Sequence, residues 1–518
     1  MSGYAITTPI YYVNAEPHIG HTYTTVVADT LARYHRMAGE ETFFLTGTDE
    51  HGDKIAEAAR AQGSEPKAFA NQISAVFRST WETLGISFDR FIRTTDPDHM
   101  HAVQHILRLI HDKGDIEFRE YQGLYCVGCE RFLTERDMQD GLCRDHERAP
   151  EERTESNYFF RMSRYFDALG EKLERDPDWI RPARYRNEVI AMLREGSGLE
   201  DLCISRPKSR LDWGIELPFD ENYVCYVWFD ALINYLAGLG YPDAPDWEER
   251  WSGVEHLVAK DILKPHGVFW PCMLMAADIP LYRHLNVHGY WNLDNRKISK
   301  SLGNMVSPMV MRERYGFDAF RYFLLRDMSF GLDSTFSEEA LVTRINADLA
   351  NNLGNLVSRT LNMTARFSGG VVPEPGPTGE LEQAVQDAAA EAAAEMDRRM
   401  RAMELHRAVE AVTRLIDATN KYLDRRAPWK AAKEEGREEE VRTTLYTCCQ
   451  TLRAIGLLLA PIIPEAASEI LKRLGQEDLL ATARLPADAA AWGALTPGTP
   501  TTKGDSLFPR VELPEETE

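Results

Sequence analysis

A doubly wound α/β fold joined to a C-terminal α-helical domain is predicted by the order of apolar patterns along the chain. An apolar, β-branched and aromatic run at residues 4–13 precedes a helical pattern, and a second run at residues 42–45 precedes TGTDEHG and another helical pattern. This order is typical of a Rossmann-like parallel sheet, whose ligands lie at the loops that leave the strands. From about residue 344 onward the patterns are almost all helical, which predicts a separate α-helical bundle.

The chain is predicted to divide into five segments. Residues 1–118 and 219–290 carry the strand patterns and form the two halves of one sheet domain. Residues 119–218 interrupt that domain as an insertion, because charged residues become frequent there and the hydrophobic periodicity weakens. Residues 291–345 contain a basic loop, and residues 346–518 form the helical domain with a C-terminal tail.

The composition is that of a globular protein with several domains. The chain has 518 residues, 44% of them hydrophobic and 27% charged, which is enough to bury several cores. A net charge of −22 argues against a non-specific DNA-binding protein. No apolar run reaches the length of a membrane span, and no basic region precedes an apolar one at the N-terminus. We therefore expect a cytoplasmic protein with no membrane partner.

The sequence PHIGH predicts an anion-binding site where the first strand passes into the first helix. Helix N-termini bind anions through their backbone N–H groups, and Gly20 leaves room for a close approach. His18 and His21 lie three residues apart, near one helical edge, where both can donate hydrogen bonds to a polyphosphate. For this motif alone, a helix start with two surface histidines or an incidental metal pair is an open alternative.

A second motif, RKISKSLGN, strengthens the phosphate interpretation. Lys297 and Lys300 follow the apolar HLNVHGYW in a polar loop, so they can close over a triphosphate and neutralise charge at an α-phosphorus under attack. Taken alone, this loop would be a solvated basic turn. The chain contains neither GxxxxGKS/T nor GxGxxG after a strand, so the common nucleotide-binding alternatives lack support.

Four residues of the insertion have the spacing of a structural zinc site. The segment YCVGCERFLTERDMQDGLCRDH contains two close ligand pairs, C-x2-C and C-x2-H, joined by a short loop. The predicted ligands are Cys126, Cys129, Cys143 and His146, which would hold one tetrahedral Zn²⁺ per chain with no open position. Such a metal orders the insertion and does no chemistry. Unbound thiols in a loop, or a redox CxxC, are the alternatives.

HIGH and KISKS together resemble the two signature motifs of class I aminoacyl-tRNA synthetases. HIGH is intact, and Ile298 replaces the usual methionine of KMSKS without disturbing the two lysines. The resemblance implies that an amino-acid carboxylate attacks the α-phosphate of ATP, bound with Mg²⁺, and that the aminoacyl-adenylate then reacts with the 3′ end of a tRNA. Catalysis would rest on positioning and charge stabilisation, because no covalent enzyme intermediate is expected.

Several segments are similar to those of the methionyl-tRNA synthetases. They are PIYYVNAEPHIGH, TGTDEHG, YVWFDALINY, AKDILKPHGVFWP and DRRAPWKAAK, in the order of that family. The resemblance implies an L-methionine side-chain pocket lined by Ile10, Tyr12, Trp228, Ala231, Tyr235 and His266. It assigns the α-ammonium group to Asp49. It assigns ATP to His18, Gly20, His21, Asp261, His288, Gly289, Lys297 and Lys300.

The chemistry of the implied pocket suits methionine. Aromatic side chains around a small residue favour a polarisable thioether, and a carboxylate is a natural partner for an ammonium group. Without the flanking motifs, Trp228 and Tyr235 would be ordinary core residues at helical spacing. The sequence differs from many members of the family at Pro265, before His266, where a phenylalanine is frequent.

The helical part of the chain is expected to bind RNA. Residues 395–433 hold ten Lys/Arg against six Asp/Glu within a chain of net charge −22. ANNLGNLVSR and APW match the anticodon-reading positions of the family, which implies that Asn355, Arg359 and Trp429 read the CAU anticodon of tRNA(Met), initiator tRNA included. On composition alone, a helix end with Trp429 as a packing anchor would be the alternative.

Two competing functions follow from the same motifs. Another class I synthetase for an apolar amino acid is the nearer one, but the leucine, isoleucine and valine enzymes usually carry a much larger editing insertion. An inactive, synthetase-like RNA-binding protein is the other, and it would be expected to lose the HIGH and KISKS residues. Many family members append a dimerising domain, and since none follows LFPRVE here we expect a monomer.

Overall fold

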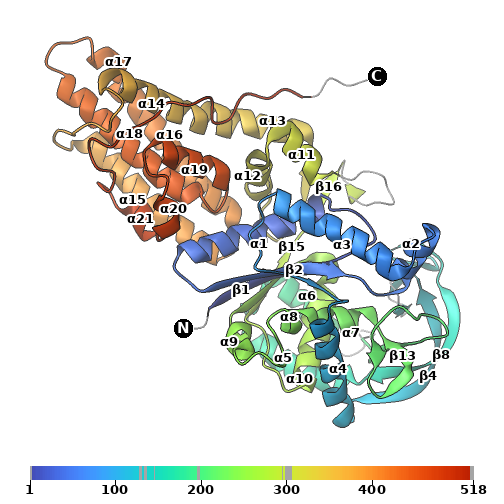
Figure 1. Cartoon of the computed structure of the whole chain (residues 1–518). Coiled ribbons are helices and arrows are strands. Elements are labelled where there is room, and N and C mark those ends of the chain that lie inside the picture. The colour runs from blue at the N-terminus through green and yellow to red at the C-terminus, as the bar shows by residue number, and fades with distance from the viewer. Residues whose placement is uncertain are drawn as a thin grey trace. The chain divides into compact units, whose positions relative to one another are not determined.

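The computed structural model describes residues 3–127, 131–133, 137–144, 146–194, 199–293, 296–297 and 306–513. The chain forms two compact units, whose elements are labelled in Figure 1. The first unit consists of Met1–Pro17 and Thr42–His288, and the second of His18–Glu41 and Gly289–Glu518. Each unit is therefore assembled from stretches that are distant in sequence.

A parallel sheet forms the centre of the first unit. Among the described residues its strand order is β3-β2-β1-β14-β15-β9, and every neighbouring pair is parallel. The strands are β1 (Tyr4–Tyr12), β2 (Thr42–Asp49), β3 (Arg90–Arg93), β9 (Ile180–Arg181), β14 (Val254–Ala259) and β15 (His284–His288). Strands β1 and β14, adjacent in the sheet, are mostly buried, as strands covered on both faces must be. The predicted doubly wound fold is confirmed.

Helices cover this sheet. Their bounds are α2 (Asp53–Ala61), α3 (Pro66–Thr83), α4 (Pro97–Asp112), α5 (Phe166–Arg175), α6 (Ala183–Leu193), α7 (Val227–Leu232), α8 (Asn234–Ala237), α9 (Trp247–Ser252) and α10 (Trp270–Ala276). Three fully buried tryptophans, Trp179, Trp251 and Trp270, fill the core between helices and sheet. Short turns η3 (Lys260–Ile262) and η4 (Pro265–Phe269) connect β14 to α10.

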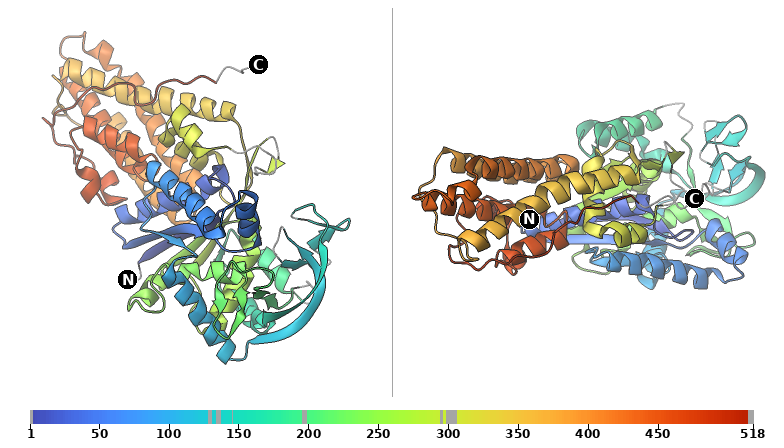
Figure 2. Two further views of the ribbon diagram at one scale, coloured as in Figure 1. Left: turned by 45° about the vertical axis from the view of Figure 1, so that its right-hand side comes forward. Right: turned by 90° about the horizontal axis from the view of Figure 1, so that it is seen from above.

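The segment predicted as an insertion is mainly antiparallel. Strand β4 (Ile116–Cys126) pairs with β8 (Glu151–Phe160) along almost its whole length, and Figure 2 shows the two as a long curved ribbon. The smaller strands in and directly after this segment are β5 (Arg131–Leu133), β6 (Met138–Gln139), β7 (Leu142–Cys143), β10 (Leu202–Cys203), β11 (Ser205–Pro207), β12 (Glu216–Leu217) and β13 (Asp220–Cys225). This segment also supplies β9, which extends the main parallel sheet.

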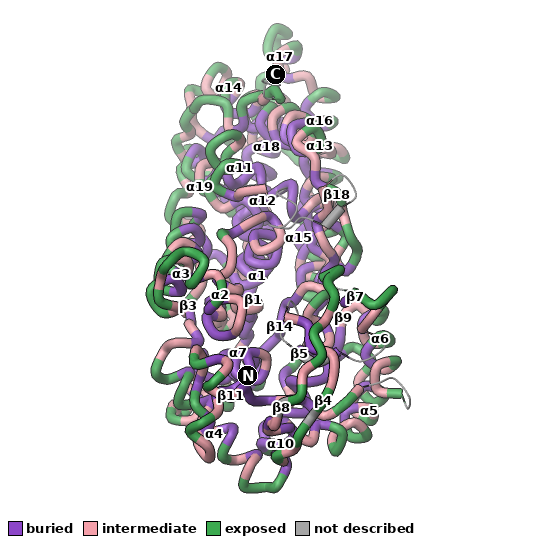
Figure 3. Tube along the Cα trace, turned by 90° about the vertical axis from the view of Figure 1, so that its right-hand side faces the viewer, coloured by how far each residue is buried: buried purple, intermediate pink, exposed green. Residues whose placement is uncertain are grey.

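Where the structure describes the second unit, it is helical apart from one small sheet, of order β17-β16-β18. Its strands are β16 (Trp291–Leu293), β17 (Arg296–Lys297) and β18 (Ser334–Phe336). Its helices are α1 (Ile19–Met37), α11 (Pro308–Tyr315), α12 (Phe317–Asp327), α13 (Glu338–Arg344), η6 (Ile345–Gly354), α14 (Asn355–Phe367), α15 (Glu380–Arg401), α16 (Leu405–Arg426), α17 (Pro428–Ala431), α18 (Glu438–Leu459), α19 (Pro464–Arg473), α20 (Leu479–Thr482) and α21 (Ala487–Ala490). Helix α18 packs against α14, α15 and α16, and most of its trace is buried in Figure 3. The predicted helical domain is thereby confirmed.

A buried ion pair joins α1 to the rest of the second unit. Arg321 on α12 is 1% exposed, and its Nη1 lies 2.6 Å from Oδ2 of the fully buried Asp29 on α1. The same guanidinium donates to the carbonyl oxygens of Pro461 and Ile462, directly after α18. Because each N–H of a buried cation needs an acceptor, this arrangement fixes three helices at once.

Asp318 on α12 caps another helix from outside. Its Oδ2 accepts the backbone N–H of Ala466 at 2.7 Å, in the first turn of α19, and the carboxyl is 7% exposed. Burial raises the pKa of Asp318 from 3.8 to about 6. The folded state therefore holds this proton more tightly than the unfolded state. The contribution stabilises the fold at low pH and is lost as the pH rises from about 4 through about 6.

Asp318→Asn keeps an oxygen for the Ala466 N–H and removes the buried charge. We expect the free energy of unfolding to rise by up to about 3 kcal/mol at neutral pH, with little change near pH 4. Urea unfolding followed by circular dichroism at both pH values measures this. The exposed Asp478→Asn is the control, and equal effects of Asp318→Asn at both pH values would contradict the prediction.

Candidate functional site

The predicted ligand residues of the first unit gather at the carboxyl edge of the parallel sheet. Tyr12 and Asp49 are the last residues of β1 and β2 and are paired across the two strands. Asp261 lies in η3, directly after β14, and His288 ends β15. Ile10 precedes Tyr12 by two residues, so both side chains leave the same face of β1. Ligands of doubly wound sheets bind at this edge, beside the point where the strand order reverses.

An aromatic wall lies beside this edge. Trp228 and Ala231 are on α7, Tyr235 is on α8 and His266 is in η4. The Tyr235 hydroxyl lies 2.7 Å from Nε2 of His266, and the rings of Trp228 and His266 meet edge to face at 6.5 Å. Tyr235 and His266 are buried, whereas Trp228 is half-buried. The structure thus brings the side chains of three predicted pocket residues together, Trp228, Tyr235 and His266.

The hydrogen bonds fix the protonation of this wall. Nδ1 of His266 lies 2.9 Å from the carbonyl oxygen of Ile262, so it carries the hydrogen and Nε2 accepts from Tyr235. Burial lowers the pKa of His266 to about 4, which keeps the ring neutral at neutral pH. Burial raises the pKa of Tyr235, and the nearby Asp49 carboxylate raises it further. The wall is therefore uncharged, with Asp49 as the carboxylate beside it.

His18 and His21 form a stacked pair at the start of α1. His18 is the N-cap: its Nδ1 accepts from Gly20 N at 3.1 Å, and Nδ1 of His21 accepts from His18 N at 3.4 Å. The rings stack with centroids 3.9 Å apart. Since both Nδ1 atoms accept, each ring carries its hydrogen on Nε2. Burial, then the neighbouring His18, lowers the pKa of His21 well below its ordinary value.

Val306 contacts the helix start that carries this histidine pair. The backbone N–H of Ile19 donates to the carbonyl oxygen of Val306 at 2.9 Å, and Val306 is the first residue described after the KISKS segment. Lys297, in β17, pairs through its backbone with Asn292 in β16. Lys300 lies outside the described residues. Gly289 is explained by close packing, because a Cβ there would lie 2.2 Å from the carbonyl oxygen of Leu332.

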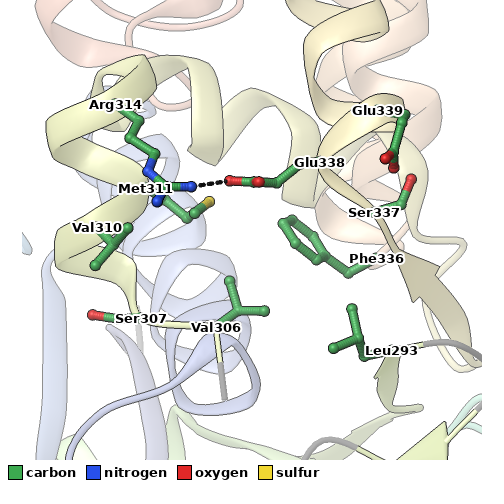
Figure 4. Close-up of a pocket in the computed structure, with 10 residues that line it drawn as sticks. All are labelled: Leu293, Val306, Ser307, Val310, Met311, Arg314, Phe336, Ser337, Glu338 and Glu339. Carbon is green, nitrogen blue, oxygen red and sulfur yellow. Dashed lines mark hydrogen bonds and ion pairs between the residues drawn. The ribbon is translucent and has the colours of Figure 1, made fainter. Parts of the chain in front are cut away.

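A pocket of about 440 Å³ lies beside both ends of the same segment (Figure 4). Leu293 and Val306 line it, and an ion pair of 2.8 Å between Arg314 and Glu338 lies across it. Its other lining residues are Ser307, Val310, Met311, Phe336, Ser337 and Glu339. Its apolar floor is made by the buried side chains of Met311 and Phe336. The sequence analysis did not anticipate it.

Three of the four predicted zinc ligands lie together. The ligand atoms of Cys126, Cys143 and His146 all lie within 4.8 Å of one another, and Sγ of Cys143 is 3.8 Å from Nδ1 of His146. A tetrahedral zinc places a sulfur and a nitrogen ligand about 3.6 Å apart, so the donor set fits this metal. Cys129 lies outside the described residues.

The three predicted anticodon residues come from two helices of the second unit. Asn355 and Arg359 are four residues apart on α14, and so share one face. Trp429 is on α17, after a turn in which Ala427 has a left-handed backbone. The Arg359 guanidinium lies 5.1 Å from the Trp429 ring centre and donates to Asp424 at 2.6 Å. Arg359 and Trp429 thus form one half-exposed platform.

Arg426, near this platform, forms an ion pair with a carboxylate of another helix. Arg426 lies three residues before Trp429 in the sequence. In the structure its Nε and Nη2 donate to the two carboxylate oxygens of Glu382 at 2.8 and 2.6 Å. The hydroxyl of Tyr422 donates to the same carboxylate at 2.7 Å. Arg426 therefore ties α16 to α15.

Sequence reasoning took only Asp49 from TGTDEHG and missed its neighbours. Glu50 and His51 are buried, and each makes hydrogen bonds to distant residues. Asp230 is also fully buried and contacts His51. The available signal was an ionisable residue inside the apolar run VWFDALINY, which a buried helix rarely accepts without a partner.

No helix within the described ranges combines the length and the apolar character that a membrane crossing needs.

Comparison with known families gives two matches. Residues 4–149 and 136–361 match the family of class I (M) tRNA synthetases. Residues 372–518 match the anticodon binding domain of methionyl tRNA ligase.

Relatives and solved structures agree with these matches. Methionine–tRNA ligase of Caldanaerobacter subterraneus subsp. tengcongensis is 43% identical over 99% of this chain and 79% of its own length. That of Mycobacterium bovis is 42% identical over the full length of both. The structure of Mycobacterium tuberculosis methionyl-tRNA synthetase bound by methionyl-adenylate has a TM-score of 0.93 at 42% identity, covering 98% of this chain and 100% of that one. The chain therefore belongs to the methionyl group of the class I aminoacyl-tRNA synthetases.

Proposed function

We propose that the chain activates L-methionine with ATP and transfers it to tRNA(Met), initiator tRNA included. The methionine carboxylate attacks the α-phosphorus of ATP, pyrophosphate leaves, and methionyl-adenylate forms. A 3′-terminal hydroxyl of the tRNA then attacks the methionyl carbonyl, and AMP leaves. The observation that supports the proposal most is that Asp49 lies beside a neutral aromatic wall at the carboxyl edge of the sheet.

In this proposal Asp49 binds the α-ammonium group, and Trp228, Tyr235 and His266 enclose the thioether. The wall has no charge at neutral pH, as a pocket for an uncharged side chain requires. Ala231 is small enough to leave room, and Ile10 and Tyr12 close the pocket from β1. Asp261, His288 and Gly289 bind the adenosine part of ATP.

The phosphates are assigned to the HIGH and KISKS residues. His18 and His21 would donate their Nε2–H groups to the triphosphate, which the capping hydrogen bonds at Nδ1 leave protonated there. The backbone at Gly20 would bind oxygen atoms at the start of α1. Lys297 and Lys300 would neutralise the charge that develops on pyrophosphate. ATP would enter as its Mg²⁺ complex.

Pyrophosphate exchange with each amino acid in turn, with Mg²⁺ and without tRNA, tests the activation step. We expect strong exchange with methionine only. Lys300→Ala should lower kcat by about 100-fold or more, since it removes a charge from the transition state. Lys503→Ala, an exposed lysine of the tail, is the control. Strong exchange with another amino acid would overturn the substrate, and no exchange by folded protein would overturn the activity.

The metal is proposed to be one structural Zn²⁺ held by Cys126, Cys129, Cys143 and His146. When bound, it would join β4 to the β6–β7 hairpin and supply no open coordination position. Two of the ligands are already buried against each other in a small cluster with Leu133.

Cys143→Ser removes one ligand and should lower the zinc content from about one per chain to well below one, because a three-ligand site binds less tightly. Elemental analysis of the purified protein measures this. Cys203→Ser, a cysteine outside the cluster, should leave the zinc content unchanged. Full zinc content in both variants would exclude Cys143 as a ligand.

Anticodon recognition is proposed for Asn355, Arg359 and Trp429. Trp429→Ala should raise the KM for tRNA by roughly 5-fold to 100-fold, because stacking on an aromatic ring contributes about 1–3 kcal/mol per base. Pyrophosphate exchange should not change, since it needs no tRNA. Trp492→Ala removes another half-buried tryptophan of the same domain and is the matched control. Equal effects of the two variants on the tRNA KM would refute the assignment.

A further inference from the structure

A fully buried carboxylate, Asp230, lies between two histidines in the first unit. Its Oδ2 is 2.7 Å from Nδ1 of His51, and its Oδ1 is 2.6 Å from Nε2 of His99. Asp230 and His99 are 0% exposed and His51 is 4% exposed. Burying a carboxylate is costly unless hydrogen bonds replace the lost water, and here each oxygen has one.

The geometry indicates which groups carry charge. Nδ1 of His99 is buried and has no hydrogen-bond partner among the described residues. A hydrogen there would be buried without an acceptor, so the ring is neutral and donates from Nε2. Burial alone would raise the pKa of Asp230, but the contacts with His51 and His99 hold it below its ordinary value. The pair of histidines therefore supports an ionised Asp230.

This network connects the two parts of the proposed methionine site. His51 follows Asp49 by two residues, at the end of β2. Asp230 lies on α7 between Trp228 and Ala231. His99, in the first turn of α4, holds the other oxygen of Asp230 from a third element. The carboxylate thus fixes the distance between the residue proposed for the ammonium group and the wall proposed for the side chain.

The segment after Asp49 is also held from the opposite side. Both carboxylate oxygens of the fully buried Glu50 accept from Arg93, at 2.7 and 2.8 Å. The Trp213 indole donates to the Glu50 carbonyl oxygen at 2.6 Å. With Glu50 fixed toward β3 and His51 fixed toward α7, the peptide that carries Asp49 has little freedom to move.

We propose that Asp230 is a positioning residue for methionine, acting through His51 and His99 to hold Asp49 at a set distance from Trp228. This positioning role rests on the proposed function, and Asp230 itself touches no substrate. The expected signature is a change in methionine binding with ATP binding retained, because neither histidine is among the residues proposed for ATP.

Asp230→Asn tests this in the full-length, zinc-loaded protein. The amide keeps one acceptor but presents an N–H group to the second histidine. We expect the methionine KM in pyrophosphate exchange to rise by about tenfold or more, while the ATP KM stays within about twofold and kcat falls little. Asn157→Ala, which removes the buried hydrogen bond to Ser205 in the same unit, is the control and should show no selective change in methionine KM.

A pair of variants at His99 covers the case in which Asp230→Asn does not fold. His99→Gln retains an N–H donor for Asp230, and His99→Leu does not. His99→Leu should raise the methionine KM as Asp230→Asn does. His99→Gln should leave the methionine KM within about threefold of that of the parent chain. A purely structural role would move the KM values for methionine and ATP together.

The result for the parent chain separates this inference from the proposed function. If the parent shows no methionine-dependent exchange, the proposed function fails. If the parent is active but folded Asp230→Asn changes the methionine KM by less than about threefold, or raises both KM values equally, the positioning role is wrong. Equal methionine KM values for the two His99 variants would also overturn it.

Discussion

The buried pair of Arg321 and Asp29 is the interaction on which the second unit depends. Helix α1 follows β1 in the chain, yet it belongs to the compact unit of α12 and the C-terminal bundle. Arg321 explains this membership, since its guanidinium binds Asp29 on α1 and two carbonyl oxygens after α18. Removing Asp29 would leave the buried Arg321 guanidinium without its carboxylate partner, at a cost of about 3–5 kcal/mol. The HIGH motif is thus rigidly attached to the helical domain.

Much of the fold could be predicted because it follows from local patterns. The apolar runs at residues 4–13 and 42–45 are strands β1 and β2, and the helical patterns after residue 344 are helices. An insertion was predicted from the altered composition of residues 119–218, but composition could not reveal that β9 within this segment pairs with the main sheet. The Arg321 pair could not be foreseen either, since its partners are 292 residues apart.

The residues of the candidate site also fall into two groups, those that sequence spacing alone brings together and those that only the packing of the fold does. His18 with His21, and Asn355 with Arg359, are close in sequence, so helical spacing alone places each pair on one face. The link from His51 to Asp230 spans 179 residues, and the platform of Arg359 and Trp429 depends on how two helices pack. The contact of Arg426 with Glu382 also joins two helices, so sequence spacing could not predict it. Motifs therefore predict which side chains can bind a ligand, but the contacts between side chains distant in sequence become visible only in the folded structure.

The N-cap of α1 has a consequence for which residues this position can tolerate. Helix N-caps are usually serine, threonine, aspartate or asparagine, whose short side chains accept one backbone N–H. His18 performs that task with Nδ1 and still has a donor at Nε2 on the far side of its ring. An aspartate here would preserve the helix start but offer no donor, and a cationic side chain would donate but not cap. A neutral imidazole does both from opposite sides of its ring, so helix stability and the proposed phosphate contact constrain the same residue.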